Sequence, residues 1–194
     1  MDTIIPRWEW RTFGTAFGAA DAKFAALATE KVQESDEIYL LSPVTDANVK
    51  IRAELMDLKT LEQTSQAGLE QWRPVMKGAF PLPLADVSTV CAALGVPPPA
   101  GRDAFTLDQL LAELGATSRG VRAVAVHKRR LRYTINGCMS EMTEVIVDGT
   151  PVRTVAIESE DAGRVVEAVH AMGLDGLPNI NYPRGLKAVV GMTG

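Results

Sequence analysis

The sequence predicts an α+β protein built on an antiparallel sheet that curls or closes on itself, with helices inserted between the strands. Charged and apolar residues alternate strictly in several short segments, the first being Arg7-Trp8-Glu9-Trp10-Arg11. Two dipeptides, Asn136-Gly137 and Asp148-Gly149, are strong signals for tight hairpin turns. The hairpin signals indicate a mostly antiparallel sheet, and the helical patterns are interpreted as separate insertions.

The N-terminal part of the chain alternates between strand and helix patterns. The period-2 pattern predicts a strand over Arg7–Phe13, which Gly14 ends, and an Ala-rich stretch predicts a helix over Ala19–Lys31. Strands are then predicted over Glu37–Leu41, Val49–Arg52 and Met56–Lys59.

The middle of the chain is rich in proline and glycine, which predicts a loop over residues 70–103. One helix interrupts it, from Ala85 to Leu94, and Gly95 ends that helix. Thr106 and Gln109 form a capping-box pattern that begins a short helix ending at Leu114. The strands on either side are too few to bury themselves, so we interpret this region as an internal loop of one domain covering residues 1–194.

The last third predicts a three-stranded meander followed by a helix. The strands are expected over Val121–Ile135, Met142–Val147 and Val152–Glu158, joined by the two hairpin turns. The helix is expected from Asp161 to Met172, with Gly173 at its end. This brings the number of predicted strands to seven or eight.

Two-residue turns fix the register of the meander. If Asn136-Gly137 and Asp148-Gly149 occupy the turns, Arg132 lies opposite Glu141 and Thr143 lies opposite both Arg130 and Thr154. One face of the sheet then carries Lys128, Arg130, Arg132, Glu141, Thr143, Thr154 and Glu158. The other face is apolar.

The same division holds in the other predicted strands, and it suggests a ligand. If the charged faces point inward, seven cations meet: Arg11, Lys50, Arg52, Lys59, Lys128, Arg130 and Arg132. A protein of net charge −4 that gathers so many cations on one concave surface is expected to bind an extended polyanion there. The alternative is an open sheet whose charged face is simply solvated.

Composition excludes several other classes. At 194 residues and net charge −4, the chain lacks the cationic surplus of a general nucleic-acid or membrane-surface binder. No apolar run is long enough to span a bilayer, and the first residues do not resemble a secretion signal. Two isolated cysteines, Cys91 and Cys138, argue against a disulfide framework or a thiolate zinc site, so a cytoplasmic location is expected.

The order of these motifs resembles the CYTH superfamily of triphosphate tunnel metalloenzymes. Arg7-Trp8-Glu9-Trp10-Arg11 stands where the family has Glu-x-Glu-x-Lys on its N-terminal strand. Val49-Lys50-Ile51-Arg52 and Leu58-Lys59 are similar to the basic strands that follow in that family, and Lys128-x-Arg130-x-x-Tyr133 is similar to its Lys-x-Arg-x-x-Tyr strand. Val155-Ala156-Ile157-Glu158 and Asn181-Tyr182 resemble its late Glu-x-Glu and Ser-Tyr elements.

This resemblance implies a closed or near-closed eight-stranded antiparallel tunnel with flanking helices. It implies that the seven cations bind triphosphate, short polyphosphate or a nucleoside triphosphate. Glu9, Glu141 and Glu158 would hold Mg²⁺ or Mn²⁺, with Glu9 and Glu158 as the catalytic carboxylates. Two departures stand out: Arg7 and Ala156 replace the first glutamate of each carboxylate pair.

Three functions therefore remain open. The first is a metal-dependent triphosphatase, and the second is a non-catalytic sensor or adaptor that binds a phosphorylated ligand through a degraded metal site. The third is an interaction module whose charged sheet meets an acidic protein. A homodimer is among the expectations.

Overall fold

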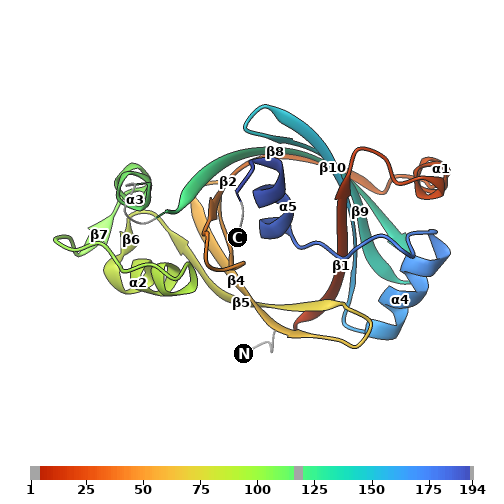
Figure 1. The fold of residues 1–194 in the computed structure, drawn as a ribbon, viewed down its shortest axis with the longest axis horizontal. Helices are drawn as coiled ribbons and strands as arrows, with labels where there is room; N and C mark the ends of the chain where they lie inside the picture. The colour runs from red at the N-terminus through yellow and green to blue at the C-terminus, as the bar shows by residue number, and fades with distance from the viewer. Residues whose placement is uncertain (1–4, 116–119, 193–194) are drawn as a thin grey trace.

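Eight strands form a closed antiparallel barrel in a computed structural model that describes residues 5–115 and 120–192. The order around the barrel is β1-β10-β9-β8-β2-β3-β4-β5, and β5 pairs back to β1 (Figure 1). The closed eight-stranded tunnel with flanking helices is confirmed, and the open, solvated sheet is excluded. In the order in which they follow along the chain, the barrel strands are β1 (Arg7–Gly14), β2 (Lys31–Leu41), β3 (Asn48–Arg52), β4 (Leu55–Thr64), β5 (Glu70–Ala79), β8 (Arg122–Ile135), β9 (Cys138–Val147) and β10 (Thr150–Ser159).

Helices cover two sides of the barrel and fill part of its interior. Strands β6 (Leu82–Pro83) and β7 (Ala104–Phe105) form a small separate sheet beside two of these helices (Figure 1). The helices in the described residues are α1 (Ala19–Ala25), α2 (Leu84–Ala93), α3 (Leu107–Leu114), α4 (Ala162–Ala171) and α5 (Tyr182–Val189). None of them is long and apolar enough to cross a membrane.

Two apolar cores lie outside the barrel. One packs the outer faces of β1, β9 and β10, including Trp10 and Ile157, against α1 and α4. The other packs Val49, Ile51 and Leu58 of β3 and β4 against α2 and α3. Because apolar residues take the outward positions of these strands, the charged residues that alternate with them point into the tunnel.

The third apolar core lies inside the barrel, where α5 closes one end (Figure 1). Tyr182 and Leu186 of this helix pack against Tyr39, Val124 and Val147 of the barrel. Lys187 fastens the helix, since its Nζ donates to Thr45 O and Asp46 Oδ1, each at 2.7 Å. The tunnel is therefore apolar at its α5 end and charged over the remainder.

Glycine permits the close approach of α5 to β1. A Cβ atom at Gly185 would lie 2.4 Å from the Phe13 ring, so any larger side chain would push the helix out of the barrel. Asn181 begins the helix by accepting a hydrogen bond from Arg184 N, and Pro183 occupies the first turn. Sequence patterns around Asn181–Lys187 favour a plain C-terminal loop, and the structure corrects this to a helix.

Two other expectations about elements are corrected. The helix predicted over Ala19–Lys31 ends at Ala25, and β2 begins at Lys31 because its eleven residues pair with β8. Residues 70–79, expected as loop, form β5. Pro74 is accommodated there because the register of β4 and β5 shifts next to it, between Leu58 and Lys59.

Candidate functional site

The hairpin registers predicted from the turn dipeptides are those found. Arg132 pairs with Glu141, and Thr143 pairs with Arg130 on one side and Thr154 on the other. Asn136 and Asp148 have positive φ, as do the glycines that follow them, which is the geometry of the tight hairpin turn. These registers direct the charged residues of three strands into the tunnel.

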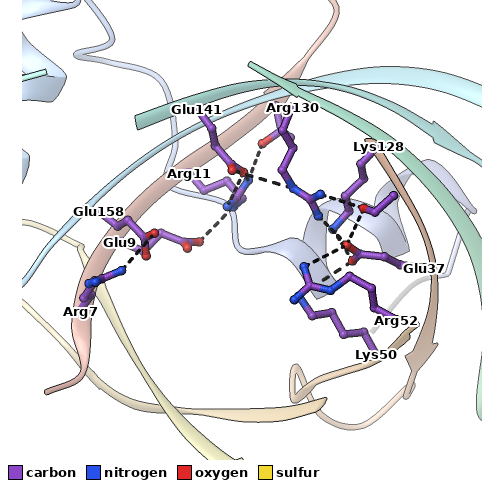
Figure 2. Close-up of polar contacts among 12 residues, drawn as sticks. Arg7, Glu9, Arg11, Glu37, Lys50, Arg52, Lys128, Arg130, Glu141 and Glu158 are labelled. Atoms are coloured by element: carbon purple, nitrogen blue, oxygen red, sulfur yellow. Dashed lines mark hydrogen bonds and ion pairs between the residues drawn. The ribbon is translucent and has the colours of Figure 1, made fainter. Parts of the chain in front are cut away.

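Four cations converge on one buried carboxylate on one side of the tunnel (Figure 2). We call Glu37, Lys50, Arg52, Lys128 and Arg130, which come from β2, β3 and β8, the basic wall. Lys128 Nζ donates to Glu37 Oε2 at 2.9 Å, and Arg130 Nη2 donates to Glu37 Oε1 at 2.5 Å. Lys50 and Arg52 lie farther away, at 3.9 and 3.7 Å.

The electrostatics of the basic wall follow from burial. Burial alone would raise the pKa of Glu37, but Lys128 and then Lys50 hold that pKa far below its usual value. Burial lowers the pKa of Lys128 well below its usual value, although Glu37 opposes this effect. Lys128 is further enclosed by aromatic rings, at 3.8 Å from the centroid of Tyr182 and 4.6 Å from that of Tyr39. The basic wall therefore places four cations around the single carboxylate of Glu37.

The four cations of the basic wall differ in their exposure and in how closely they contact Glu37. The Lys128 and Arg130 side chains are 2% and 6% exposed, and both donate directly to Glu37. The Arg52 side chain is 37% exposed and makes only the longer contact. Arg52 and Lys50 can therefore turn toward a ligand without breaking a short hydrogen bond.

The opposite side of the tunnel is rich in carboxylates. We call Glu9, Glu70, Glu141 and Glu158, which come from β1, β5, β9 and β10, the acidic wall. Glu9 is the direct cross-strand partner of both Glu158 and Glu70. Burial raises the pKa of Glu158, and the neighbouring charge of Glu9 raises it further. Burial also raises the pKa of Glu70, which accepts hydrogen bonds from Asn181 and Trp72.

Two arginines lie among these carboxylates (Figure 2). Arg11 Nε lies 3.0 Å from Glu9 Oε1, and Arg11 Nη1 lies 3.3 Å from Glu141 Oε1. Arg7 Nη1 lies 3.7 Å from Glu158 Oε1. The three carboxylates predicted to hold a metal thus each have an arginine partner.

This arrangement does not fit a divalent metal ion. Mg²⁺ and Mn²⁺ need several oxygen ligands directed at one point. In residues 5–115 and 120–192, no three His, Cys, Asp or Glu side chains are grouped closely enough to hold an ion. Oxygens of Glu9, Glu141 and Glu158 instead face guanidinium groups.

Two pockets adjoin the acidic wall, and each is lined by a predicted site cation that belongs to neither wall. A pocket of about 280 Å³ is lined by Arg132, Lys31 and Glu158, among others. A second, of about 360 Å³, is lined by Lys59, Arg7 and Glu158. Within the described parts of the chain, neither Arg132 nor Lys59 has an ion-pair partner, and the buried Nε of Arg132 has no hydrogen-bond partner.

The structure thus brings the predicted site residues to the inside of one barrel, in separate groups. Lys50, Arg52, Lys128 and Arg130 gather on the basic wall, and Arg11 lies with Glu9, Glu141 and Glu158 on the acidic wall. Lys59 and Arg132 line the two pockets. Their roles in binding or catalysis stay predictions.

Sequence reasoning missed the central carboxylate. Glu37 was only the first residue of a predicted strand, and the inward-facing alternation Lys31, Gln33, Ser35, Glu37 was hidden within a supposed helix and loop. Its position two residues before Tyr39 was the available signal, because both then point to the same side. Glu70 was missed because β5 was expected as loop.

Comparison with known proteins supports the fold. No family model matches the chain, and no curated protein matches it in sequence. Among solved structures, it is similar to a putative adenylyl cyclase from Hippeastrum, HpAC1, described as having a dominant triphosphatase activity. The identity is 13% and the TM-score 0.54, and the alignment covers 95% of this chain and 96% of that chain.

Two further structures are similar to a lesser degree. A putative adenylate cyclase from Bacillus halodurans (bh2851) has 10% identity and a TM-score of 0.48, with coverage of 92% and 96%. The protein PH1819 from Pyrococcus horikoshii OT3 has 15% identity and a TM-score of 0.43, with coverage of 94% and 98%. The closed eight-stranded barrel that the sequence resemblance implied is confirmed, and the fold is similar to that of HpAC1.

Proposed function

We propose that the tunnel binds a polyanion of the triphosphate class on its basic wall. The candidates are inorganic triphosphate, a short polyphosphate and the triphosphate group of a nucleotide. The observation that carries this proposal is the group of four cations around the single carboxylate of Glu37, inside a closed barrel (Figure 2).

Charge balance is the first physical argument. Besides Glu37, the basic wall touches only Asp57, 4.0 Å from Lys50, and Glu141, 4.0 Å from Arg130, among the described acidic residues. Cations held close together repel one another, and a polyanion relieves this repulsion with several charge-assisted hydrogen bonds. A single phosphate could reach only part of the wall, whereas a chain of phosphates can contact several cations at once.

The second argument is that the charged face is enclosed, and it concerns the hypothesis of a module that binds an acidic protein. The charged face lines the inside of a barrel that α5 closes at one end, so it is not presented to the surface of another protein. A small, elongated ligand that enters the tunnel is the better match. An interaction module would need this charged face to meet an acidic protein, so that function is not favoured.

Metal-dependent hydrolysis remains a second candidate, and one observation favours it. Glu9 and Glu158 face each other from paired strands, as the resemblance to tunnel enzymes implies for catalytic carboxylates. Because the acidic wall does not fit a metal here, we derive no hydrolytic step. Phosphate release from tripolyphosphate, with and without Mn²⁺, tests this candidate: release that depends on Mn²⁺ and is lost in Glu158→Gln would establish it.

Binding is tested by calorimetric titration of the full chain with tripolyphosphate and with monophosphate. We expect tripolyphosphate to bind at least tenfold more tightly, and its affinity to fall as salt is raised because ion pairs are screened. Thermal unfolding should shift upward with tripolyphosphate, since a ligand that binds only the folded state stabilises it. Equal or undetectable binding of the two anions would contradict the proposal.

A further inference from the structure

The acidic wall carries its own cations where a metal is expected. Arg11 lies between Glu9 and Glu141, at 3.0 and 3.3 Å, and Arg7 reaches Glu158 at 3.7 Å. Figure 2 shows both guanidinium groups directed at these carboxylates. In the pattern that the sequence resembles, position 7 is a glutamate, so the substitution by arginine exchanges a metal ligand for a positive charge.

Arg11 is fixed in this position from several sides. Its side chain is only 8% exposed, its Nη1 donates to Thr154 Oγ1 at 3.2 Å, and its guanidinium lies 4.5 Å from the centroid of the Tyr182 ring. Its backbone N–H donates to Asn179 Oδ1 at 2.7 Å. Because a guanidinium group does not lose its proton in proteins, this positive charge is permanent.

Arg7 is placed differently, and its exposure matters. Its side chain is 44% exposed, and it lines the same pocket as Lys59. The longer contact to Glu158 leaves several N–H groups free to donate. Guanidinium is planar and matches two oxygens of one phosphate, so Arg7 is suited to contact a ligand in this pocket.

From this geometry we infer that Arg7, beside the permanent charge of Arg11, supplies the positive charge that a divalent metal would bring to the acidic wall, so that the tunnel binds its polyphosphate ligand without a metal. This inference rests on the proposed function and adds to it. It separates two kinds of tunnel: one in which the ligand enters with a metal ion, and one in which the protein itself neutralises the whole ligand.

The two cases differ in how Mn²⁺ affects binding. If carboxylates hold a metal against the ligand, removal of the metal weakens binding. If arginines already neutralise the acidic wall, Mn²⁺ adds nothing, and by complexing free tripolyphosphate it weakens the apparent affinity. Calorimetric titration of the full chain with tripolyphosphate, once with EDTA and once with millimolar Mn²⁺, distinguishes them.

The decisive variant is Arg7→Glu, with Arg7→Gln beside it. In EDTA, we expect Arg7→Glu to bind tripolyphosphate at least tenfold more weakly than wild type, and Mn²⁺ to restore much of that loss, because a carboxylate at position 7 completes a ligand pair with Glu9. Arg7→Gln should lose less in EDTA and gain nothing from Mn²⁺. The Arg7 side chain is 44% exposed, so we expect both variants to keep the fold, and thermal unfolding checks this.

Arg129→Glu is the matched control. Arg129 is 41% exposed, close to the value for Arg7, but it lies on the outside of β8 between Glu34 and Glu144. The variant makes the same change in net charge, and its affinity should stay within about threefold of wild type in both conditions.

The titrations distinguish support for the inference, failure of the inference alone, and failure of the proposed function. Wild-type affinity that is equal or weaker with Mn²⁺, together with the loss in Arg7→Glu, supports the inference. Binding that is at least tenfold tighter with Mn²⁺, or unchanged in Arg7→Glu under EDTA, overturns the inference and leaves the proposed function standing. If wild type binds tripolyphosphate in neither condition, the proposed function itself is overturned.

Discussion

The two walls of the tunnel use the same kinds of residue in opposite proportions. On the basic wall, four cations surround the fully buried carboxylate of Glu37. On the acidic wall, Glu9, Glu141 and Glu158 pair with Arg7 or Arg11, and the pKa values of Glu70 and Glu158 are raised. Positive and negative side chains thus gather on opposite sides of the tunnel interior. An elongated anion is therefore expected to bind along the basic wall.

Glu37→Gln should break this contrast most strongly. Without the carboxylate, Lys128 and Arg130 would stay buried with no adequate counter-ion, and removal of one partner of a buried ion pair costs about 3–5 kcal/mol. We expect a decrease of that size in the free energy of unfolding, measured by urea denaturation. Glu158→Gln, the counterpart on the acidic wall, should change it by less than about 1 kcal/mol, because its contact to Arg7 is long and partly exposed.

A similar loss of stability in both variants would contradict the contrast between the walls. A second measurement guards against misfolding: tripolyphosphate should raise the melting temperature of Glu37→Gln more than that of wild type. The ligand would then replace the missing counter-ion.

Arg52→Ala should separate binding from stability. Loss of a charge-assisted hydrogen bond corresponds to about 1.5–3 kcal/mol, which is roughly tenfold or more in affinity for tripolyphosphate. Stability should change little, since Arg52 makes one long ion pair. Calorimetric titration measures the affinity, and Arg129→Ala on the outer face is the control, for which no change is expected.

The two walls should respond to pH with opposite sign. Glu37 has a lowered pKa, so its contribution to stability is present above its ordinary value of 4.5 and is lost as the pH falls below it. Glu158 has a raised pKa, so its contribution is present below 4.5 and is lost as the pH rises through the raised value.

Urea denaturation between pH 3 and pH 7 measures this difference. The stability of wild type relative to Glu37→Gln should shrink toward low pH, and that of wild type relative to Glu158→Gln should shrink toward high pH. The same sign for both variants would show that the carboxylates do not differ as described.

Tyr182→Phe should have the smallest effect, and it sharpens the account of the basic wall. The Tyr182 hydroxyl is buried with no hydrogen-bond partner in the described residues, while its ring stacks on Tyr39 and covers Lys128. Removal of the hydroxyl should change the free energy of unfolding by less than about 1 kcal/mol. Tyr39→Phe, which loses the hydroxyl that accepts from Lys128 at 2.6 Å, should cost more by the same measurement.

Local chemistry explains which parts of the fold the sequence could predict. The dipeptides Asn136-Gly137 and Asp148-Gly149 define two hairpins, and their registers place Arg130, Arg132 and Glu141 on one face without knowledge of the rest of the chain. The capping box at Thr106 and Gln109 likewise depends on four consecutive residues.

Long-range contacts explain what could not be predicted. The barrel closes through pairing of β1 with β5 and β10, which no local pattern encodes. Strand β5 contains Pro74 and Gly78, which favour a loop until neighbouring strands supply partners. Helix α5 contains Gly185 and begins beside Pro183, and it forms where the barrel interior buries Tyr182 and Leu186.

The site shows the same division. The cations of the basic wall were accessible from alternation within their own strands, but Glu37 was not, because its importance comes from meeting Lys128 of β8 across a long chain separation. The pairing of Arg7 with Glu158 also depends on the meeting of β1 and β10.

A crystal structure of the protein with tripolyphosphate tests the central claim most directly. The account predicts phosphate oxygens within hydrogen-bonding distance of Lys50, Arg52 and Arg130 inside the barrel. Tripolyphosphate bound only on the outer surface, with the four cations still turned toward Glu37, would contradict it.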